Sequence, residues 1–482
     1  MCWPAHLQVW FTCSADDDSA GNGDGVKNYR FWLAAAFVAY IFVDLARRFF
    51  EGTKALLVVF DLGLLAAYVA YFTSQRESFR RSLRGQVFFV AMCLYALLVV
   101  VECANPSPYA RYAVTKVLAL RNYLSALPAV WLGYDLASRA GRRSLLKLGH
   151  WFQWLFIIVA MFGIVAYFIR GGSTQDTDAV LKPLAGAVRS YEQGQLTLSS
   201  SFFATSVRFA FFLLGGYLIL WAHCKETGRQ LWPIALIAAA GFYVSGSRAL
   251  LTMFLIFLGL STVFFRASKG QLSRRFVATA LATGAVIAVG MLFSADISRA
   301  LAGEDHRTRA AYMIQGRTEY LERSQMAFSP LYLRPDNPDI VFGIGVGTFG
   351  QETFAVPALN RSSYRFVTRF FYEEPGMPLA DSGLTKICIE SGVVGLVIMT
   401  FFFLTVMWIS AGCILRSAVN RDAFGFAMAF YPLAWIMIFL KGHQVLGGLE
   451  TTTFLFLCTG FVLHSLERQE PSSFSAPVPS AT

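Results

Sequence analysis

The sequence predicts an all-α, polytopic membrane protein with about 12 transmembrane helices and one long extramembrane loop of short helices. Composition is the first observation behind this prediction, because 56% of the 482 residues are hydrophobic and only 15% are charged. Soluble domains carry about 25% charged residues. The second observation is a series of apolar runs close to the roughly 20 residues that a helix needs to cross a bilayer. Together they exclude a soluble fold.

The predicted spans follow from these apolar runs in order along the chain. They lie at 30–46, 55–72, 86–102, 117–136, 151–169, 207–222, 231–245, 247–265, 276–294, 392–415, 424–440 and 451–465. The stretch 231–265 can also be divided differently. Two longer connections remain, at about 170–206 and at 295–391, and the second is far longer than a connector requires.

Lys and Arg residues give the predicted orientation, because cytoplasmic loops of membrane proteins collect them. Basic clusters follow every second span: Arg76, Arg80, Arg81 and Arg84; Arg139, Arg142, Arg143 and Lys147; Lys225 and Arg229; Arg266, Lys269, Arg274 and Arg275; Arg416 and Arg421. All of them fall on one side, which we take as cytoplasmic, whereas Arg47, Arg48 and Lys54 would lie outside. This bias accounts for the net charge of +11 without a nucleic-acid partner.

The orientation predicts the organisation of the whole chain. We expect disordered cytoplasmic tails at 1–28 and 467–482, with no cleavable signal peptide in the first. Transmembrane helices 1–9 occupy 29–294, a large periplasmic loop occupies 295–391, and helices 10–12 occupy 392–466. The eight cysteines show no CxxC or metal-ligand spacing, so we expect neither a disulfide framework nor a metal site.

Arg248 is the first candidate functional residue. It follows Ser245, Gly246 and Ser247, which break one apolar run and open the next. A guanidinium beside free backbone amides at a helix start is suited to binding an anion such as phosphate. The alternative is an ordinary arginine that extends to the membrane surface.

The glycine-rich segment 342–350 (FGIGVGTFG) is the second candidate. Alternate glycines also occur in nucleotide-binding loops, but this segment lacks the GxGxxG spacing, a preceding strand and a later acidic residue. We therefore predict a tight turn packed near the membrane surface.

Asp381 and Glu390 are the third candidate. They are nine positions apart, or about 13 Å of rise on one helix. Asp381 stands where the long loop meets the next span, where a carboxylate could act as a general base, and either Asp381 or Ser382 could also cap the helix. The loop before them carries arginines that suit a diphosphate: Arg307, Arg309, Arg317, Arg323, Arg361, Arg365 and Arg369.

In order and spacing, these segments resemble the O-antigen ligase and polymerase superfamily of membrane glycosyltransferases. The resemblance covers about 110–465. It rests on the Ser247-Arg248 turn, the glycine turn after an Arg317-led helix, and the ExGxxGL stretch at 390–396. It implies an all-helical, GT-C-like membrane fold.

One departure distinguishes two members of this superfamily. Ligases usually carry His-Asn before the ExG stretch, whereas Asp381 and Ser382 occupy those positions here. Polymerases often carry Asp there. The resemblance therefore implies a polymerase of exopolysaccharide, capsule or O-antigen repeat units, with an O-antigen ligase as the alternative.

The resemblance also implies substrates and residue roles. Donor and acceptor are oligosaccharides on undecaprenyl diphosphate, joined with inversion at the periplasmic face of a bacterial inner membrane, without cofactor or metal. Asp381 is the implied base, and Arg248 and Arg317 neutralise the leaving diphosphate. The implied substrate contacts are Arg121, Arg208, Arg365 and Glu390. Such polymerases often work with a chain-length regulator.

A transporter or flippase is the main alternative outside enzymes. It predicts polar groups at mid-membrane, broken helices and repeated halves. Asp61 lies within a predicted span, but the sequence has no repeated halves, and a transporter leaves the Arg-rich loop unexplained. A purely structural membrane protein leaves the loop unexplained too.

Overall fold

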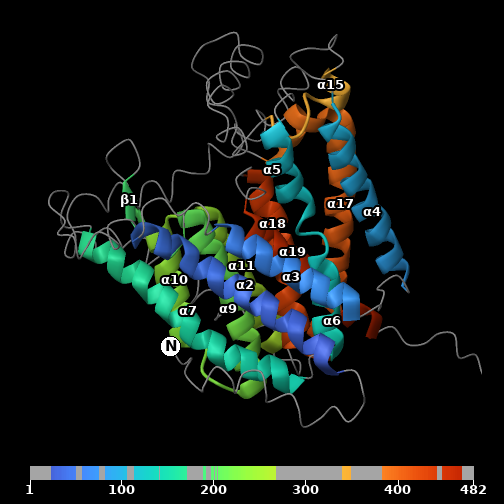
Figure 1. The fold of residues 1–482 in the computed structure, drawn as a ribbon. Coiled ribbons are helices and arrows are strands. Elements are labelled where there is room, and N and C mark those ends of the chain that lie inside the picture. Colours follow the sequence, from blue (N-terminus) through green and yellow to red (C-terminus); the bar gives the residue numbers. More distant parts are fainter. Residues whose placement is uncertain are drawn as a thin grey trace, which may run out of the picture. The chain divides into compact units, whose positions relative to one another are not determined.

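The structure is a computed structural model in which the described part of the chain is almost entirely helical (Figure 1). It describes residues 23–49, 57–74, 82–105, 113–139, 142–170, 188–190, 197–199, 201–203, 205–266, 339–348, 383–441 and 448–468. The chain divides into two compact units, and each unit combines two separate stretches of sequence. The first unit is Met1–Glu77 with Arg142–Glu322, and the second is Ser78–Gly141 with Arg323–Thr482.

The first unit is a group of apolar helices around an aromatic core. Its helices are α2 (Gly23–Phe49), α3 (Leu57–Ser74), α7 (Arg142–Arg170), α9 (Ser206–Thr227), α10 (Trp232–Ser245) and α11 (Arg248–Arg266). Helices α2 and α3 lie side by side, as Figure 1 shows. The Tyr217 ring of α9 meets the Phe254 ring of α11 edge to face, with the ring centroids 4.7 Å apart, and both side chains are buried.

The second unit contains the elements that form the candidate site. Its helices are α4 (Leu83–Cys103), α5 (Ala113–Leu124), α6 (Ala129–Arg139), α15 (Asp339–Phe342), α17 (Gly383–Asn420), α18 (Ala423–Lys441) and α19 (Leu449–Arg468). Helix α17 packs against α4 and α18, and α15 lies at one end of α17 (Figure 1).

The helices indicate a protein embedded in a membrane. Among the described residues, six helices are long and apolar enough to cross a bilayer: Leu83–Cys103, Gly149–Tyr167, Ser206–Thr227, Gly383–Asn420, Ala423–Leu440 and Leu449–Arg468. Four shorter apolar helices accompany them. Large apolar side chains such as Leu97 and Val100 on α4 are exposed, and a lipid environment removes the cost of that exposure.

Most predicted spans coincide with observed helices. Helices cover the runs at 30–46, 86–102, 151–169, 207–222, 424–440 and 451–465, and they cover 57–72, 232–245 and 248–265 of three further predicted runs. The run at 276–294 lies outside the described residues. Helix α17 covers 392–415 but begins at Gly383, so residues 383–391, expected in the long loop, are helical. The rest of that loop is described only at 339–348.

The predicted single helix at 117–136 is wrong. Residues 125–128 form a turn between α5 and α6, and the turn contains Pro128. Proline has no backbone N–H to donate within a helix, and its ring disfavours a helical conformation in the residue before it.

The expectation that the chain contains helices alone also needs one small correction. Strands β1 (Val188–Ser190) and β2 (Thr197–Ser199) form an antiparallel pair, with Arg189 opposite Leu198.

Helices α6 and α19 approach each other closely through two glycines. A Cβ atom added at Gly460 would collide with the backbone oxygen of Val130, and one added at Gly133 would collide with the backbone oxygen of Leu457. Small residues permit such close helix packing in membrane proteins, where dispersion contacts take over from hydrophobic burial. The two glycines therefore fix the distance between the helices.

We predict that Gly460→Ala lowers the free energy of unfolding by about 1–3 kcal/mol, because the added methyl group overpacks the α6–α19 contact. The matched control is Gly259→Ala in α11, where an added Cβ meets nothing within 4 Å. That variant should be neutral or stabilising, since alanine is the better helix former. Thermal unfolding of the purified protein in detergent measures both. Equal melting temperatures for the two variants would contradict the packing described.

Candidate functional site

A break in helix α17 forms the base of the candidate site. Gly392 has φ 58° and ψ −153°, a combination that is essentially restricted to glycine. In an unbroken helix, the carbonyl groups before this position would accept hydrogen bonds from N–H groups of the next turn. At the break those donors are not in place. The carbonyl oxygens of Ile389 and Glu390 instead accept hydrogen bonds from the N–H groups of Ile344 and Gly345, each at 2.9 Å.

The glycine-rich segment is the turn that supplies these donors. Gly343, Gly345 and Gly347 have φ angles of 70°, 96° and 79°, which glycine adopts without strain. A Cβ at Gly343 would collide with the backbone of Glu390, so only glycine permits this approach. The predicted tight turn is confirmed. Its N–H groups at 344, 345 and 347 donate to α17, so these groups are not available to a nucleotide phosphate.

Glu390 joins the turn to helix α5. Its carboxylate accepts a hydrogen bond from the Tyr123 hydroxyl at 2.6 Å and another from the Gly347 N–H at 3.0 Å. Lys386, one helical turn earlier, places its Nζ 3.8 Å from the same carboxylate. Both charged side chains are about 1% exposed. Breaking such a buried pair by removing one partner costs about 3–5 kcal/mol, so this arrangement strongly favours one geometry.

A second layer of contacts supports this cluster. The Tyr95 hydroxyl donates to the Tyr123 carbonyl oxygen at 3.1 Å. The Asn105 amide donates to both the Glu102 carboxylate at 3.0 Å and the Gly343 carbonyl oxygen at 3.3 Å. These contacts connect helix α4 to both α5 and the glycine turn.

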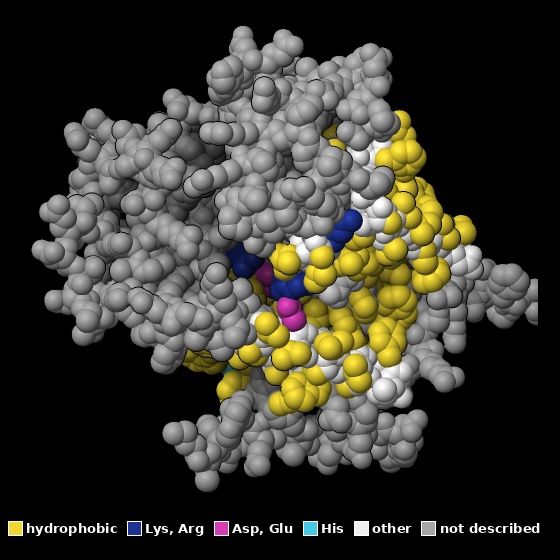
Figure 2. Space-filling view, turned by 45° about the horizontal axis from the view of Figure 1, so that its top comes forward, with side chains coloured by type: hydrophobic (Ala, Val, Ile, Leu, Met, Phe, Trp, Pro, Cys, Tyr) yellow, Lys and Arg dark blue, Asp and Glu magenta, His cyan; other side chains and the backbone are white. Residues whose placement is uncertain are grey.

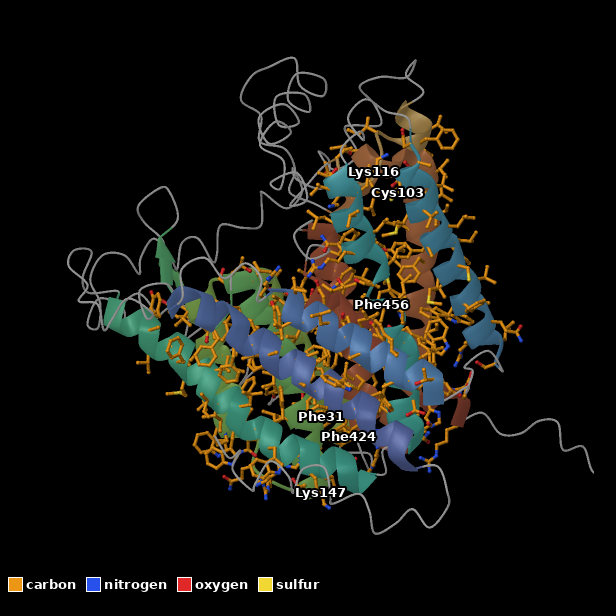
Figure 3. All side chains as sticks on the ribbon, in the orientation of Figure 1. Phe31, Cys103, Lys116, Lys147, Phe424 and Phe456 are labelled. Atoms are coloured by element: carbon orange, nitrogen blue, oxygen red, sulfur yellow. The ribbon has the colours of Figure 1, made fainter. Side chains whose placement is uncertain are left out.

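Lys116 adds a further link between α4 and α5. Its ammonium group donates to the Cys103 carbonyl oxygen at 2.6 Å, and Figure 3 shows the two residues at neighbouring ends of these helices. A cation at a helix C-terminus is stabilised by the carbonyl groups exposed there. Figure 2 shows Lys, Arg and acidic side chains gathered in one place on a surface that is otherwise largely hydrophobic. Lys386 and Glu390 are ionisable residues inside an apolar helix of membrane-spanning length, and such residues mark a candidate functional site by default.

The predicted site residues divide between the two units. Arg121 belongs to the second unit with Glu390, and its Nη1 donates to the Asn122 side-chain oxygen at 3.1 Å. Arg208 lies in the first turn of α9, where its backbone N–H is capped by the Thr205 hydroxyl at 3.3 Å. Arg248 is the first residue of α11. The remaining predicted residues, Asp381, Arg317 and Arg365, lie outside the described residues.

The predicted Ser-Gly-Ser turn before Arg248 is confirmed. Helix α10 ends at Ser245, and Gly246 adopts a left-handed conformation with φ 68°. The Ser245 hydroxyl then accepts a hydrogen bond from the Ser247 N–H at 3.3 Å. Arg248 is thereby placed at the start of a new helix, as the sequence indicated.

The role expected for Glu390 changes in the light of its contacts. A carboxylate that is buried and occupied by Tyr123, Gly347 and Lys386 positions the surrounding backbone, so we do not assign it to substrate binding. Sequence reasoning missed Tyr123 and Lys386. Lys386 carried a usable signal, because a lysine in an apolar helix one turn before an acid predicts a buried pair.

Comparisons with known proteins add no family to this picture. No protein-family model matches the chain, and no curated protein sequence matches it significantly. Among the described residues, no three His, Cys, Asp or Glu side chains lie close enough to hold a metal ion.

We predict that Gly392→Ala destabilises the protein by about 1–3 kcal/mol, because alanine is strained in the backbone conformation found there. The control is Gly412→Ala on the same helix, where an added Cβ makes only ordinary contacts, the nearest at 3.6 Å from Arg84. Chemical unfolding in mixed micelles compares the two. A Gly392→Ala protein as stable as the Gly412→Ala protein would show that the helix is not broken at this position.

Proposed function

We propose that this protein is a membrane glycosyltransferase that polymerises oligosaccharide repeat units carried on undecaprenyl diphosphate. One observation carries the proposal: the glycine turn at 343–347 contacts Glu390, the first residue of the ExGxxGL stretch. The resemblance to O-antigen polymerases selected these two segments independently. Gly347 and Glu390 are 43 residues apart, so chain connectivity alone does not bring them together.

Asp381 is the proton acceptor in this proposal, and Glu390 is a positioning residue. Asp381 precedes the first residue of α17 by two positions in the sequence. The segment of α17 that follows it is held by the pairing of Lys386 and Glu390 and by the Tyr123 hydroxyl. A rigid support of this kind matters because general bases act only within hydrogen-bonding distance of the proton that they remove.

The proposed reaction is an inverting glycosyl transfer. The acceptor hydroxyl oxygen bonds to the anomeric carbon of the donor while its proton passes to the Asp381 carboxylate. The bond from that carbon to the diphosphate oxygen breaks, and the electron pair leaves with the lipid diphosphate. Fixed cations that meet the developing charge supply a large part of catalysis in such reactions. We assign this role to Arg248 and Arg317, with Arg121, Arg208 and Arg365 as further contacts.

The membrane setting is consistent with this substrate. A polyprenyl lipid remains in the bilayer, so its enzyme must present catalytic groups beside apolar helices. Six of the described helices are long and apolar enough to cross a bilayer. The proposal includes the periplasmic face of a bacterial inner membrane as the location, a chain-length regulator as a partner, and no nucleotide or metal.

A transporter is the second candidate, and one observation favours it. Helix α17 is broken at Gly392 beside the buried Lys386 and Glu390, and transporters place broken helices and buried charges at their binding sites. The break here is filled by the glycine turn, whose N–H groups donate to the freed carbonyl groups. Because protein already occupies the break, we favour the glycosyltransferase.

We predict that Asp381→Asn lowers polymerisation by about 10²–10⁴-fold, because the amide cannot accept the acceptor's proton. Arg248→Lys should also impair it, since lysine cannot form the two parallel hydrogen bonds of a guanidinium with phosphate. A deletion strain carrying each variant is analysed for long glycan and for lipid-linked single repeat units. The expected result is loss of long polymer while single lipid-linked units remain.

The matched control is Arg468→Gln, which removes an exposed cation at the end of α19. It should retain full polymer, and immunoblots of the membrane fraction establish that every variant is present in equal amount. Lipid-linked polymer that still forms but is never transferred would indicate the ligase. Unchanged glycans in the deletion strain would overturn the enzyme assignment and favour transport.

A further inference from the structure

The beginning of α7, the end of α9 and the beginning of α10 meet at one end of the first unit. Arg229, just after α9, places its Nη1 3.2 Å from the His150 Nδ1 of α7. A Cβ added at Gly149 would lie 2.6 Å from the His223 ring nitrogen, so α7 and α9 are in direct contact here. Each of two apolar stretches has one terminus here: Gly149–Tyr167 begins at this point, and Ser206–Thr227 ends at it. This end therefore lies at a boundary between apolar and polar surroundings.

Positive charge dominates this end. Across α7, α9 and α10, Glu226 is the only acidic residue. Lys147 is exposed near the start of α7, where Figure 3 labels it. Within the part of the chain that the structure describes, neither Lys147 nor Arg229 forms an ion pair with a carboxylate. Two cations are thus left to interact with an anion from outside the chain.

Three exposed tryptophans lie within a few residues of these cations in the sequence, two on α7 and one at the start of α10. The exposed fractions are 50% for Trp151, 58% for Trp154 and 62% for Trp232. The Trp232 indole N–H donates to the Gln230 side-chain oxygen at 3.1 Å, which orients the ring. Tryptophan is enriched at the membrane–water boundary because its ring is apolar and its N–H is polar. These side chains indicate that the surface contacts lipid at the level of the head groups.

His223 is an independent observation that points to a ligand. Its side chain is 2% exposed, and neither ring nitrogen has a hydrogen-bond partner among the described residues. Arg229 and His150 both act on its ring electrostatically. A buried polar group without a partner is unfavourable, and such groups often mark a water, ion or ligand that completes the site.

We propose that Lys147, His150, His223 and Arg229 bind the phosphate of an anionic phospholipid head group. Arginine forms paired hydrogen bonds with phosphate, and lysine adds a mobile point charge. The exposed tryptophans favour a lipid over free phosphate, because they hold the site at the bilayer surface. Basic pockets between membrane helices are known binding sites for anionic lipid head groups. The inference does not depend on the proposed glycosyltransferase activity.

The test measures lipid binding to the purified full chain. Native mass spectrometry and thermal unfolding are run with phosphatidylglycerol and with phosphatidylcholine. We expect phosphatidylglycerol to bind preferentially and raise the melting temperature. The double variant Arg229→Gln with Lys147→Gln should bind it about 30-fold more weakly, because each basic residue contributes about a fivefold gain near an anionic surface. Arg229→Lys should retain part of the affinity.

Arg468→Gln is the matched control, because it removes an exposed cation from another helix end. It should bind phosphatidylglycerol as the wild type does. Equal melting temperatures of all variants in phosphatidylcholine alone would show that folding is intact. The proposal is overturned if the double variant responds to phosphatidylglycerol as the wild type does, or if both lipids act equally. It is also overturned if inorganic phosphate at the same concentration reproduces the effect.

Discussion

Glu390 is a carboxylate inside an apolar protein, and the second unit is arranged to satisfy it. A charge removed from water is unfavourable unless hydrogen-bond donors and a counter-charge surround it. Tyr123 of α5, Gly347 of the turn and Lys386 of α17 supply these from three separate segments. None of the three segments can shift alone without leaving a buried polar group unpaired. The constraint thus turns three short motifs into one rigid arrangement.

The sequence predicted the helices well, because apolar runs of membrane length are a strong signal and the turn at 245–247 has a clear chemical signature. It failed at 117–136, where the apolar pattern continued through a turn containing Pro128. It also extended the long loop to residue 391, although Asp381 or Ser382 was a possible helix cap, so the predicted span left out Lys386 and Glu390. Their mutual pairing, which is a tertiary contact, allows them to be helical and buried.

The two regions of charge in this protein differ in how they are neutralised. Around Glu390 the charges are paired within the chain and buried, so they specify structure. At Lys147 and Arg229 the charges are left without an acidic partner among the described residues, so they are suited to an external anion. An enzyme acting on lipid-linked glycans needs both: a rigid support for the reacting groups and a stable position in the bilayer. Only the first contributes to the proposed chemistry.

A double-mutant cycle between Tyr123 and Glu390 tests the central interaction most directly. The free energy of unfolding in mixed micelles is measured for Tyr123→Phe, Glu390→Leu and the double variant. The buried hydrogen bond predicts a coupling energy of about 0.5–3 kcal/mol. The control pairs Glu390→Leu with Tyr217→Phe. The Tyr217 hydroxyl lacks a hydrogen-bond partner among the described residues, so these two changes should have additive effects. Additive effects for Tyr123 and Glu390 as well would contradict the account, because Glu390 would then not hold α5 in place.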